Sequence, residues 1–136
     1  YVAGLVEELP GPAAVVNMAG DLSFAELVAL VDRAALVVTN DSGPLHVASA
    51  LDVPTVALFG PETPARYGPL ASQRLVFYAG LACSPCMSVD NRKTVDCRYN
   101  ALCMRSIPAD HVWARVEPFV AGLPTRRERR GARGLP

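Results

Sequence analysis

The sequence predicts an α/β fold, specifically a Rossmann-like doubly wound parallel sheet. Short, continuous apolar runs occur at residues 13–18, 36–39 and 55–59, and such runs are typical of strands buried on both faces of a parallel sheet. The segments between these runs have helical patterns, and a β-α-β-α-β order with short links is that of a doubly wound layer. The 136 residues are 51% hydrophobic and 19% charged, which fits one domain with a substantial core.

The first expected elements are a strand at residues 13–18 (AAVVNM) and a helix that follows it. Ser23 and Glu26 have the spacing of a capping box, in which each residue bonds to the other's backbone N–H. The apolar residues after the cap recur at positions i, i+3, i+4 and i+7, which predicts an amphipathic helix of about three turns. These residues are Phe24, Leu27, Val28 and Val31.

The next elements alternate between strand and helix. A second strand is expected at 36–39 (LVVT), and a short Ala-rich helix at 44–51 begins after a glycine and ends before Asp52 and Pro54. A third strand is expected at 55–59 (TVALF). Residues 74–78 (RLVFY) predict a fourth strand, which would extend the sheet.

The C-terminal third divides into three parts. A polar stretch at 82–106 holds all four cysteines and is interpreted as an insertion in a single domain over residues 1–123. Pro108 opens a last helix, in which five apolar residues are expected to share one face. Residues 124–136 are rich in Pro, Gly and Arg and are expected to be disordered. The five residues of the expected helix face are Val112, Trp113, Val116, Phe119 and Val120.

Charge and hydropathy exclude several classes of protein. The 13 Lys and Arg balance the 13 Asp and Glu, which argues against a nucleic-acid-binding protein. No run approaches the roughly 20 apolar residues of a membrane-spanning helix. The chain opens on Tyr1 without a leader pattern, so we expect a fragment of a longer chain. The arginine-rich end is either a solvated tail or an electrostatic contact with an anionic membrane surface.

The loop after the second strand is the strongest candidate for a binding site. Ligands of open α/β sheets bind at the carboxyl ends of strands, and a helix N-terminus offers free N–H groups to an anion. Ser42 supplies a hydroxyl, Gly43 permits close backbone approach, and His46 lies one turn into the helix. This pattern favours a phosphate site. The alternative is that Asp41 or Ser42 only caps the helix and that His46 is a surface residue.

The third strand also ends in a rigid loop, FGPETPARYGP at 59–69, with three prolines and two glycines. Such a loop commonly lines a pocket. Arg66 is its only cation, and it would pair with a diphosphate or with Glu62, or else cover the edge of the sheet.

The run from Asp21 to Pro69 strongly resembles glycosyltransferase family 9, the lipopolysaccharide heptosyltransferases. The motif D-S-G-P-L-H at 41–46, followed by L-F-G-P at 58–61, carries the resemblance over roughly residues 13–69. Members are GT-B enzymes with two domains, so the resemblance implies the C-terminal half of such an enzyme. It implies donor binding here, and an acceptor domain with an aspartate as general base outside this chain.

The resemblance also implies roles for individual residues. Asp41, Ser42, Gly43 and His46 match the family's donor-binding motif, with Ser42 and Gly43 at the diphosphate and His46 near a phosphate or the sugar. Leu22 matches a position whose neighbourhood lines the base pocket. Sugar transfer is expected to invert the anomeric centre and to need no metal or other cofactor. Glu62 stands where the family usually has Thr, which allows a different sugar donor.

The cysteines have the pattern C-x2-C-x10-C-x5-C, with the count needed for tetrahedral zinc. The long second spacing leaves three alternatives open: a structural zinc site, paired disulfides and free thiols. In each case we expect the cluster to shape local structure rather than to catalyse. The four residues are Cys83, Cys86, Cys97 and Cys103.

We therefore expect the donor-binding part of a cytoplasmic hexosyl- or heptosyltransferase. Its partners would be a nucleotide sugar such as ADP-heptose and a lipid-linked saccharide acceptor of lipopolysaccharide biosynthesis, with peripheral contact at the inner membrane face. As an isolated fragment it should be inactive. The alternative is a non-catalytic nucleotide-binding domain or a metal-stapled interaction domain.

Overall fold

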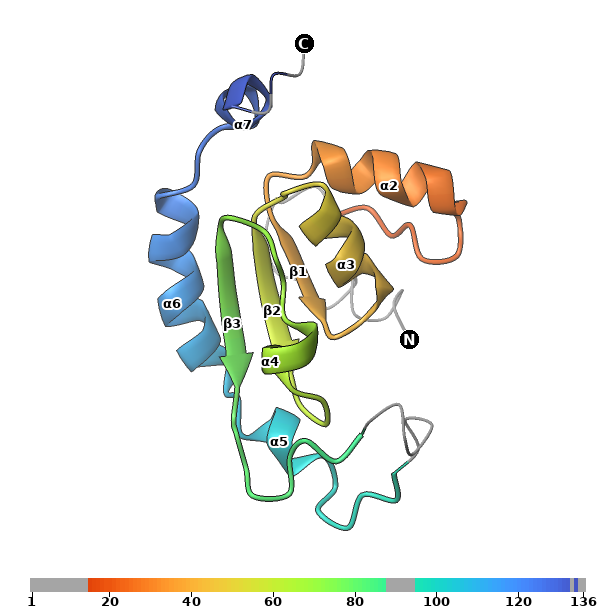
Figure 1. Cartoon of the computed structure of the whole chain (residues 1–136), viewed down its shortest axis with the longest axis vertical. Coiled ribbons are helices and arrows are strands. Elements are labelled where there is room, and N and C mark those ends of the chain that lie inside the picture. Colours follow the sequence, from red (N-terminus) through yellow and green to blue (C-terminus); the bar gives the residue numbers. More distant parts are fainter. Residues whose placement is uncertain (1–14, 88–94, 133, 135–136) are drawn as a thin grey trace.

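The computed structural model describes residues 15–87, 95–132 and 134, and centres on a three-stranded parallel sheet (Figure 1). The strands are β1 (Val37–Asn40), β2 (Thr55–Phe59) and β3 (Arg74–Tyr78), in the order β1-β2-β3. The register pairs Asn40 with Leu58 and Phe59 with Tyr78, so all three strands end at one edge of the sheet.

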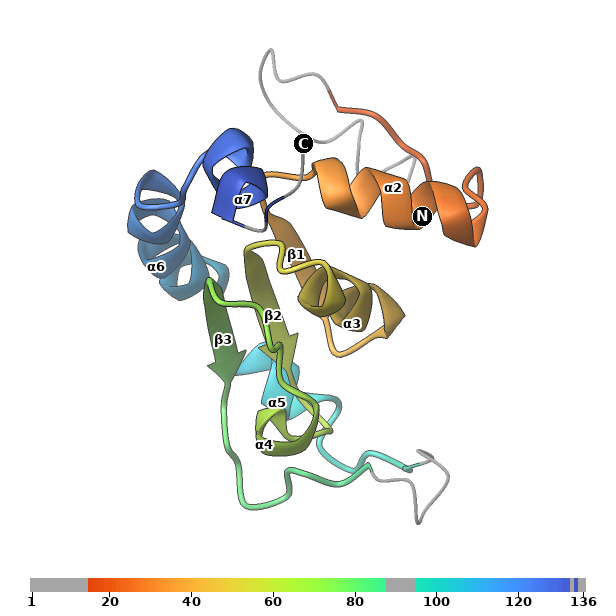
Figure 2. The same cartoon turned by 45° about the horizontal axis from the view of Figure 1, so that its top comes forward.

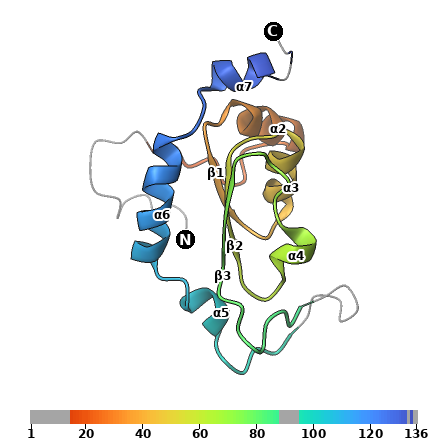
Figure 3. The same cartoon turned by 60° about the vertical axis from the view of Figure 1, so that its left-hand side comes forward.

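Helices cover both faces of this sheet (Figure 3). On one face lie α2 (Phe24–Arg33) and α3 (Gly43–Ala50), and α6 (Ala109–Ala121) lies on the other. The side chains of β2 alternate between the two cores: Ala57 packs with Leu45 of α3, whereas Val56 packs with Val116 of α6. The predicted α/β fold with a doubly wound parallel sheet is therefore confirmed.

Three short helices lie beyond the ends of the strands (Figure 2). The carboxyl ends lie near α4 (Pro64–Tyr67) and α5 (Leu102–Arg105), and the amino ends lie near α7 (Arg126–Ala132). Within the described ranges, no helix is long and apolar enough to cross a bilayer.

The predicted capping box of α2 is confirmed. The backbone N–H of Ser23 donates to Glu26 Oε2 over 2.8 Å, and the N–H of Glu26 donates to Ser23 Oγ over 3.4 Å. Hydrogen bonds from the Ser23 side chain and backbone lower the pKa of Glu26. The predicted strands at 36–39, 55–59 and 74–78 and the helix at 44–51 are also confirmed, to within a residue at their ends.

Two sequence predictions about apolar residues are wrong. Residues 15–18 form no strand, and the predicted residues 13 and 14 lie outside the described part of the chain. Val16 is 74% exposed, so its side chain is not buried in the sheet as the prediction requires. In α6, Trp113 and Val120 are exposed, since each directly follows a residue of the buried stripe and lies about 100° around the helix from it. That stripe is Val112, Val116 and Phe119.

The expectation of a disordered end is wrong for residues 126–132, which form α7. A second capping box starts this helix: the N–H of Thr125 donates to Glu128 Oε2 over 2.7 Å, and the N–H of Glu128 donates to Thr125 Oγ1 over 3.3 Å. Hydrogen bonds from Thr125 lower the pKa of Glu128. Arg129 is only 7% exposed, and its Nη2 donates to the carbonyl of Ala34 over 2.8 Å. This arginine therefore belongs to the folded domain.

Candidate functional site

A cavity of about 280 Å³ lies at the carboxyl edge of the sheet. The parallel register brings the ends of β1 and β2 together, and the loops that follow these strands form much of its wall. The remaining wall comes from the cysteine-bearing segment, which contributes two methionines. The lining residues are Asn40, Asp41, Leu58, Gly60, Pro61, Glu62, Met87 and Met104.

The loop after β1 leads into the N-terminus of α3 without capping it. Ser42 occupies the N-cap position in an extended conformation, but its side chain makes no cap hydrogen bond. Its Oγ instead lies 3.0 Å from Thr39 Oγ1 and donates to the carbonyl of Asn40 over 3.3 Å. The Ser42 side chain therefore caps none of the first N–H groups of α3; Pro44 has no N–H, and that of Leu45 donates to the Ser42 carbonyl over 3.0 Å. The start of such a helix can receive an anion in α/β proteins.

The predicted site residues are only partly gathered around the cavity. Asp41 lines it and is half-buried, and Ser42 and Gly43 follow directly in the chain. His46 is exposed, one turn into α3, and is not part of the cavity wall. Leu22 is half-buried just before the cap of α2 and is likewise not part of that wall.

Gly43 faces open space. A Cβ built on this residue meets no heavy atom within 4 Å, and its backbone does not have the positive φ that favours glycine. Neither packing nor backbone conformation therefore requires a glycine here. The remaining physical reason for a glycine at this position is that it lets a ligand approach the start of α3 closely.

The cysteine-bearing segment is fastened to the loop after β2 by backbone hydrogen bonds. The carbonyl of Pro61 accepts from the N–H of Cys86 (2.8 Å) and from that of Met87 (2.9 Å). Gly60 is in close contact with α5, because a Cβ at this residue would lie 2.5 Å from Met104 Sδ. These contacts bring both methionines to the cavity, and local sequence patterns gave no signal for this placement.

Glu62 is the buried acid of the cavity, at 5% exposure. Its Oε1 accepts weakly from the N–H of Thr63 over 3.3 Å, while Oε2 finds no hydrogen-bond partner in the described part of the chain. Arg66 does not pair with this acid: it is exposed and lies 5.9 Å from the ring centroid of Tyr67. From the sequence, Glu62 differs from the Thr that is usual in the resembled family, but its burial follows only from the tertiary structure.

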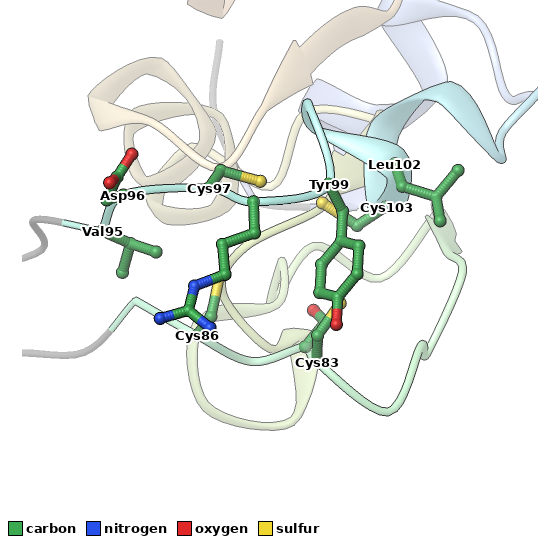
Figure 4. A pocket seen from close by; sticks show the side chains of 10 residues that line it. Cys83, Cys86, Val95, Asp96, Cys97, Tyr99, Leu102 and Cys103 are labelled. Carbon is green, nitrogen blue, oxygen red and sulfur yellow. The ribbon is translucent and has the colours of Figure 1, made fainter.

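All four cysteines line a second cavity, of about 150 Å³ (Figure 4). They form no disulfide. Burial raises the pKa of the Cys86 thiol, and the charges of the other three cysteines raise it further. Cys97 Sγ accepts a hydrogen bond from the N–H of Ala101 over 3.3 Å.

Of the three alternatives for the cysteines, the zinc site is not supported. Tetrahedral zinc needs four sulfurs at about 2.3 Å from one point. Here Cys103 is buried in α5 while Cys83 and Cys97 are exposed. Within residues 15–87 and 95–132, no group of three or more His, Cys, Asp and Glu is arranged to hold a metal.

Comparison with known proteins decides the family. The sequence profile of glycosyltransferase family 9 (heptosyltransferase) matches residues 2–95, more than half of the chain. The chain belongs to glycosyltransferase family 9. The match includes both loops at the carboxyl edge of the sheet and therefore most of the cavity wall.

Individual relatives agree with this assignment. Lipopolysaccharide heptosyltransferase 2 of Salmonella typhimurium is 45% identical over 60 residues, which is 44% of this chain and 17% of the relative. Lipopolysaccharide heptosyltransferase 1 of Pseudomonas aeruginosa is 30% identical over 115 residues, 78% of this chain and 32% of the relative. The solved Escherichia coli ADP-heptose lipopolysaccharide heptosyltransferase II superposes with a TM-score of 0.58 at 27% identity.

That superposition covers 77% of this chain and 27% of the solved chain. Its extent confirms the fold class predicted from the sequence. The matches span 17% of one of these two curated relatives and 32% of the other. The chain thus spans less than a third of the length of either relative.

Proposed function

We propose that this chain binds the nucleotide-sugar donor of a heptosyltransferase, and that the donor is ADP-heptose. The observation that carries the proposal is the juxtaposition of the uncapped N-terminus of α3 with the cavity between the ends of β1 and β2. One part can receive a diphosphate and the other an uncharged group, which is the chemical make-up of a nucleotide sugar. The match to family 9 also supports the proposal that the chain binds a nucleotide-sugar donor.

Each predicted residue has a role in this proposal. The backbone at Ser42 and Gly43 would approach the diphosphate, where the N–H groups and partial positive charge of the helix terminus stabilise negative charge. The Ser42 hydroxyl lies within the same loop, and His46 would donate to a phosphate or sugar oxygen from one turn into the helix. Leu22, at the start of α2, would lie toward the base.

The transfer step needs groups from outside this chain. An acceptor hydroxyl would form a new bond to the anomeric carbon, and the bond from that carbon to the diphosphate would break. ADP would leave with the bonding electrons, and the acceptor proton would pass to a general base in the acceptor-binding part. The start of α3 would stabilise the charge that develops on the leaving diphosphate.

A lipid-linked saccharide of lipopolysaccharide biosynthesis is the proposed acceptor. Such an acceptor is found at a membrane surface, so we propose a cytoplasmic enzyme in peripheral contact with the inner membrane. The exposed Arg127 of α7 is available for that contact, whereas the buried Arg129 is not.

Two measurements test the function. Calorimetric titration of the 136-residue chain should show weak binding of ADP and of ADP-heptose, with no release of heptose to an acceptor. The protein in its full length should transfer heptose from ADP-heptose to a lipopolysaccharide-type acceptor. Failure of the chain to bind either ligand contradicts donor binding. Binding without transfer by the full-length protein would instead favour a non-catalytic nucleotide-binding domain.

A further inference from the structure

Resting on the proposed donor site, we propose that Glu62 determines sugar specificity by accepting a hydrogen bond from a hydroxyl of the sugar that is transferred. Glu62 follows β2 and lines the cavity at the carboxyl edge of the sheet. The ligand class is a nucleotide sugar whose sugar carries a hydroxyl directed at this carboxylate.

The first argument is the unsatisfied oxygen. Glu62 is 5% exposed, and its Oε2 finds no hydrogen-bond partner among the residues that the structure describes. A buried polar atom without a partner costs about 1–3 kcal/mol. The bond that Oε1 accepts from the Thr63 N–H is long, at 3.3 Å, and leaves the second oxygen unused. A ligand donor is the group that would satisfy it.

The second argument is charge. The cavity is lined by two acids, Asp41 and Glu62, and none of its described lining residues is Lys, Arg or His. Two carboxylates repel a diphosphate, so that group belongs at the start of α3 rather than in the cavity. The cavity is therefore suited to an uncharged group that donates hydrogen bonds. Sugar hydroxyls fulfil both conditions.

The third argument is the shape and chemistry of the remaining wall. Leu58, Pro61, Met87 and Met104 present apolar surface, which can pack against the C–H face of a sugar ring. At about 280 Å³ the cavity suits part of a donor rather than a whole nucleotide sugar.

Access to the unsatisfied oxygen requires a side-chain movement. Oε2 is closed off from solvent, so a hydroxyl can reach it only after a neighbouring side chain moves. Met87 and Met104 are the long, unbranched side chains of the wall and can change rotamer at small cost. In this proposal, sugar binding therefore includes a rotamer change in the wall of the cavity.

The test compares ADP with ADP-heptose in the full-length protein. Glu62→Gln keeps the size of the side chain and removes its charge, and Glu62→Leu keeps a similar size and removes both acceptor oxygens. Both variants should raise the Kd of ADP-heptose at least about tenfold, because a charge-assisted hydrogen bond is lost. The Kd of ADP, which lacks the sugar, should stay within about twofold. Glu117→Gln, which alters an exposed acid on α6, is the matched control and should change neither.

The outcomes separate this inference from the proposed function. If neither ligand binds the wild-type protein, the donor site itself is wrong. If both ligands bind and Glu62→Gln weakens them equally, Glu62 serves the nucleotide and the inference is overturned. If ADP-heptose binding by the wild type requires a divalent cation, and Glu62→Gln abolishes that requirement, the occupant is a cation and the inference is again overturned. Glu62→Leu decides the matter should the Gln variant not fold.

Discussion

Polar groups at the two edges of the sheet differ in whether they make hydrogen bonds within the fold. At the carboxyl edge, Ser42 does not cap α3, Gly43 faces open space, and Glu62 Oε2 finds no partner in the described residues. At the amino edge the Asp52 carboxylate accepts from the backbone N–H of Ser72 over 2.6 Å, and from its hydroxyl over 2.6 and 2.7 Å. Ser42 and Glu62 thus leave hydrogen-bonding capacity unused, whereas Asp52 and Ser72 use theirs within the fold.

This difference separates groups that stabilise the chain from groups that are available to a ligand. A polar group that makes its hydrogen bonds within the fold contributes to stability, whereas a buried one without a partner costs free energy and is retained where binding compensates for it. The carboxyl ends of parallel strands are also where ligands bind in open α/β sheets. Substitutions at the carboxyl edge should therefore change binding, and those at the amino edge should change stability.

The largest expected effect is at Gly43. Gly43→Val places a branched side chain in the open space before α3 and should weaken ADP binding more than about 100-fold, because the backbone can no longer approach the diphosphate. The free energy of unfolding should change by less than about 0.5 kcal/mol. Isothermal titration and thermal unfolding measure the two effects.

Gly131→Val is the matched control for this variant. Gly131 is also in a helix and also meets no atom within 4 Å of a built Cβ, but it lies in α7 at the other edge. Its replacement should leave ADP binding unchanged. Equal affinity of wild type and Gly43→Val would contradict the phosphate assignment.

The next effect in size is at Asp52, on the amino edge. Asp52 has φ 47°, a conformation that Asn tolerates, so Asp52→Asn removes the charge without adding backbone strain. Weaker hydrogen bonds to Ser72 should lower the free energy of unfolding by about 1–2 kcal/mol and leave the Kd of ADP within about twofold. A double-mutant cycle with Ser72→Ala isolates the contribution of the hydroxyl. If Asp52→Asn instead reduces ADP binding and leaves stability unchanged, the assignment of the amino edge to stability is contradicted.

Local patterns predicted most of the fold. The capping box at Ser23 and the apolar periodicity after it depend on residues within two turns, so α2 can be predicted from sequence. The same box at Thr125 and Glu128 is a weaker signal in the sequence, because arginines rather than apolar residues follow it. Arg129 reaches a residue 95 positions earlier in the chain, and no local pattern contains that contact.

The candidate site divides in the same way. The loop at Asp41 and Ser42 was predictable because strand, loop and helix are consecutive in the chain. The two methionines of the cavity could not be predicted, because Met87 is placed by its hydrogen bond to Pro61 and Met104 by the packing of α5 on Gly60. The burial of Glu62 depends on the same tertiary contacts. Sequence alone therefore identifies the loop that is proposed to bind phosphate but not the cavity beside it.

The smallest expected effect compares two arginines of α7. Arg129 is buried and donates to the Ala34 carbonyl over 2.8 Å, while Arg127 is exposed two residues earlier. Arg129→Ala should lower the free energy of unfolding by about 1 kcal/mol, and Arg127→Ala should change it by less than about 0.5 kcal/mol. Chemical denaturation measures both.

These two variants also test whether α7 stabilises the fold at the amino edge of the sheet or only carries positive charge. Each removes one positive charge, so a purely electrostatic tail predicts equal and negligible effects of both on stability. A loss confined to Arg129→Ala instead assigns that arginine to the fold. Binding to anionic vesicles at low salt should then fall for Arg127→Ala, because an exposed arginine near such a surface contributes about 1 kcal/mol. Unchanged vesicle binding, also after deletion of residues 125–136, would exclude a membrane role for this end and leave α7 a structural element of the amino edge.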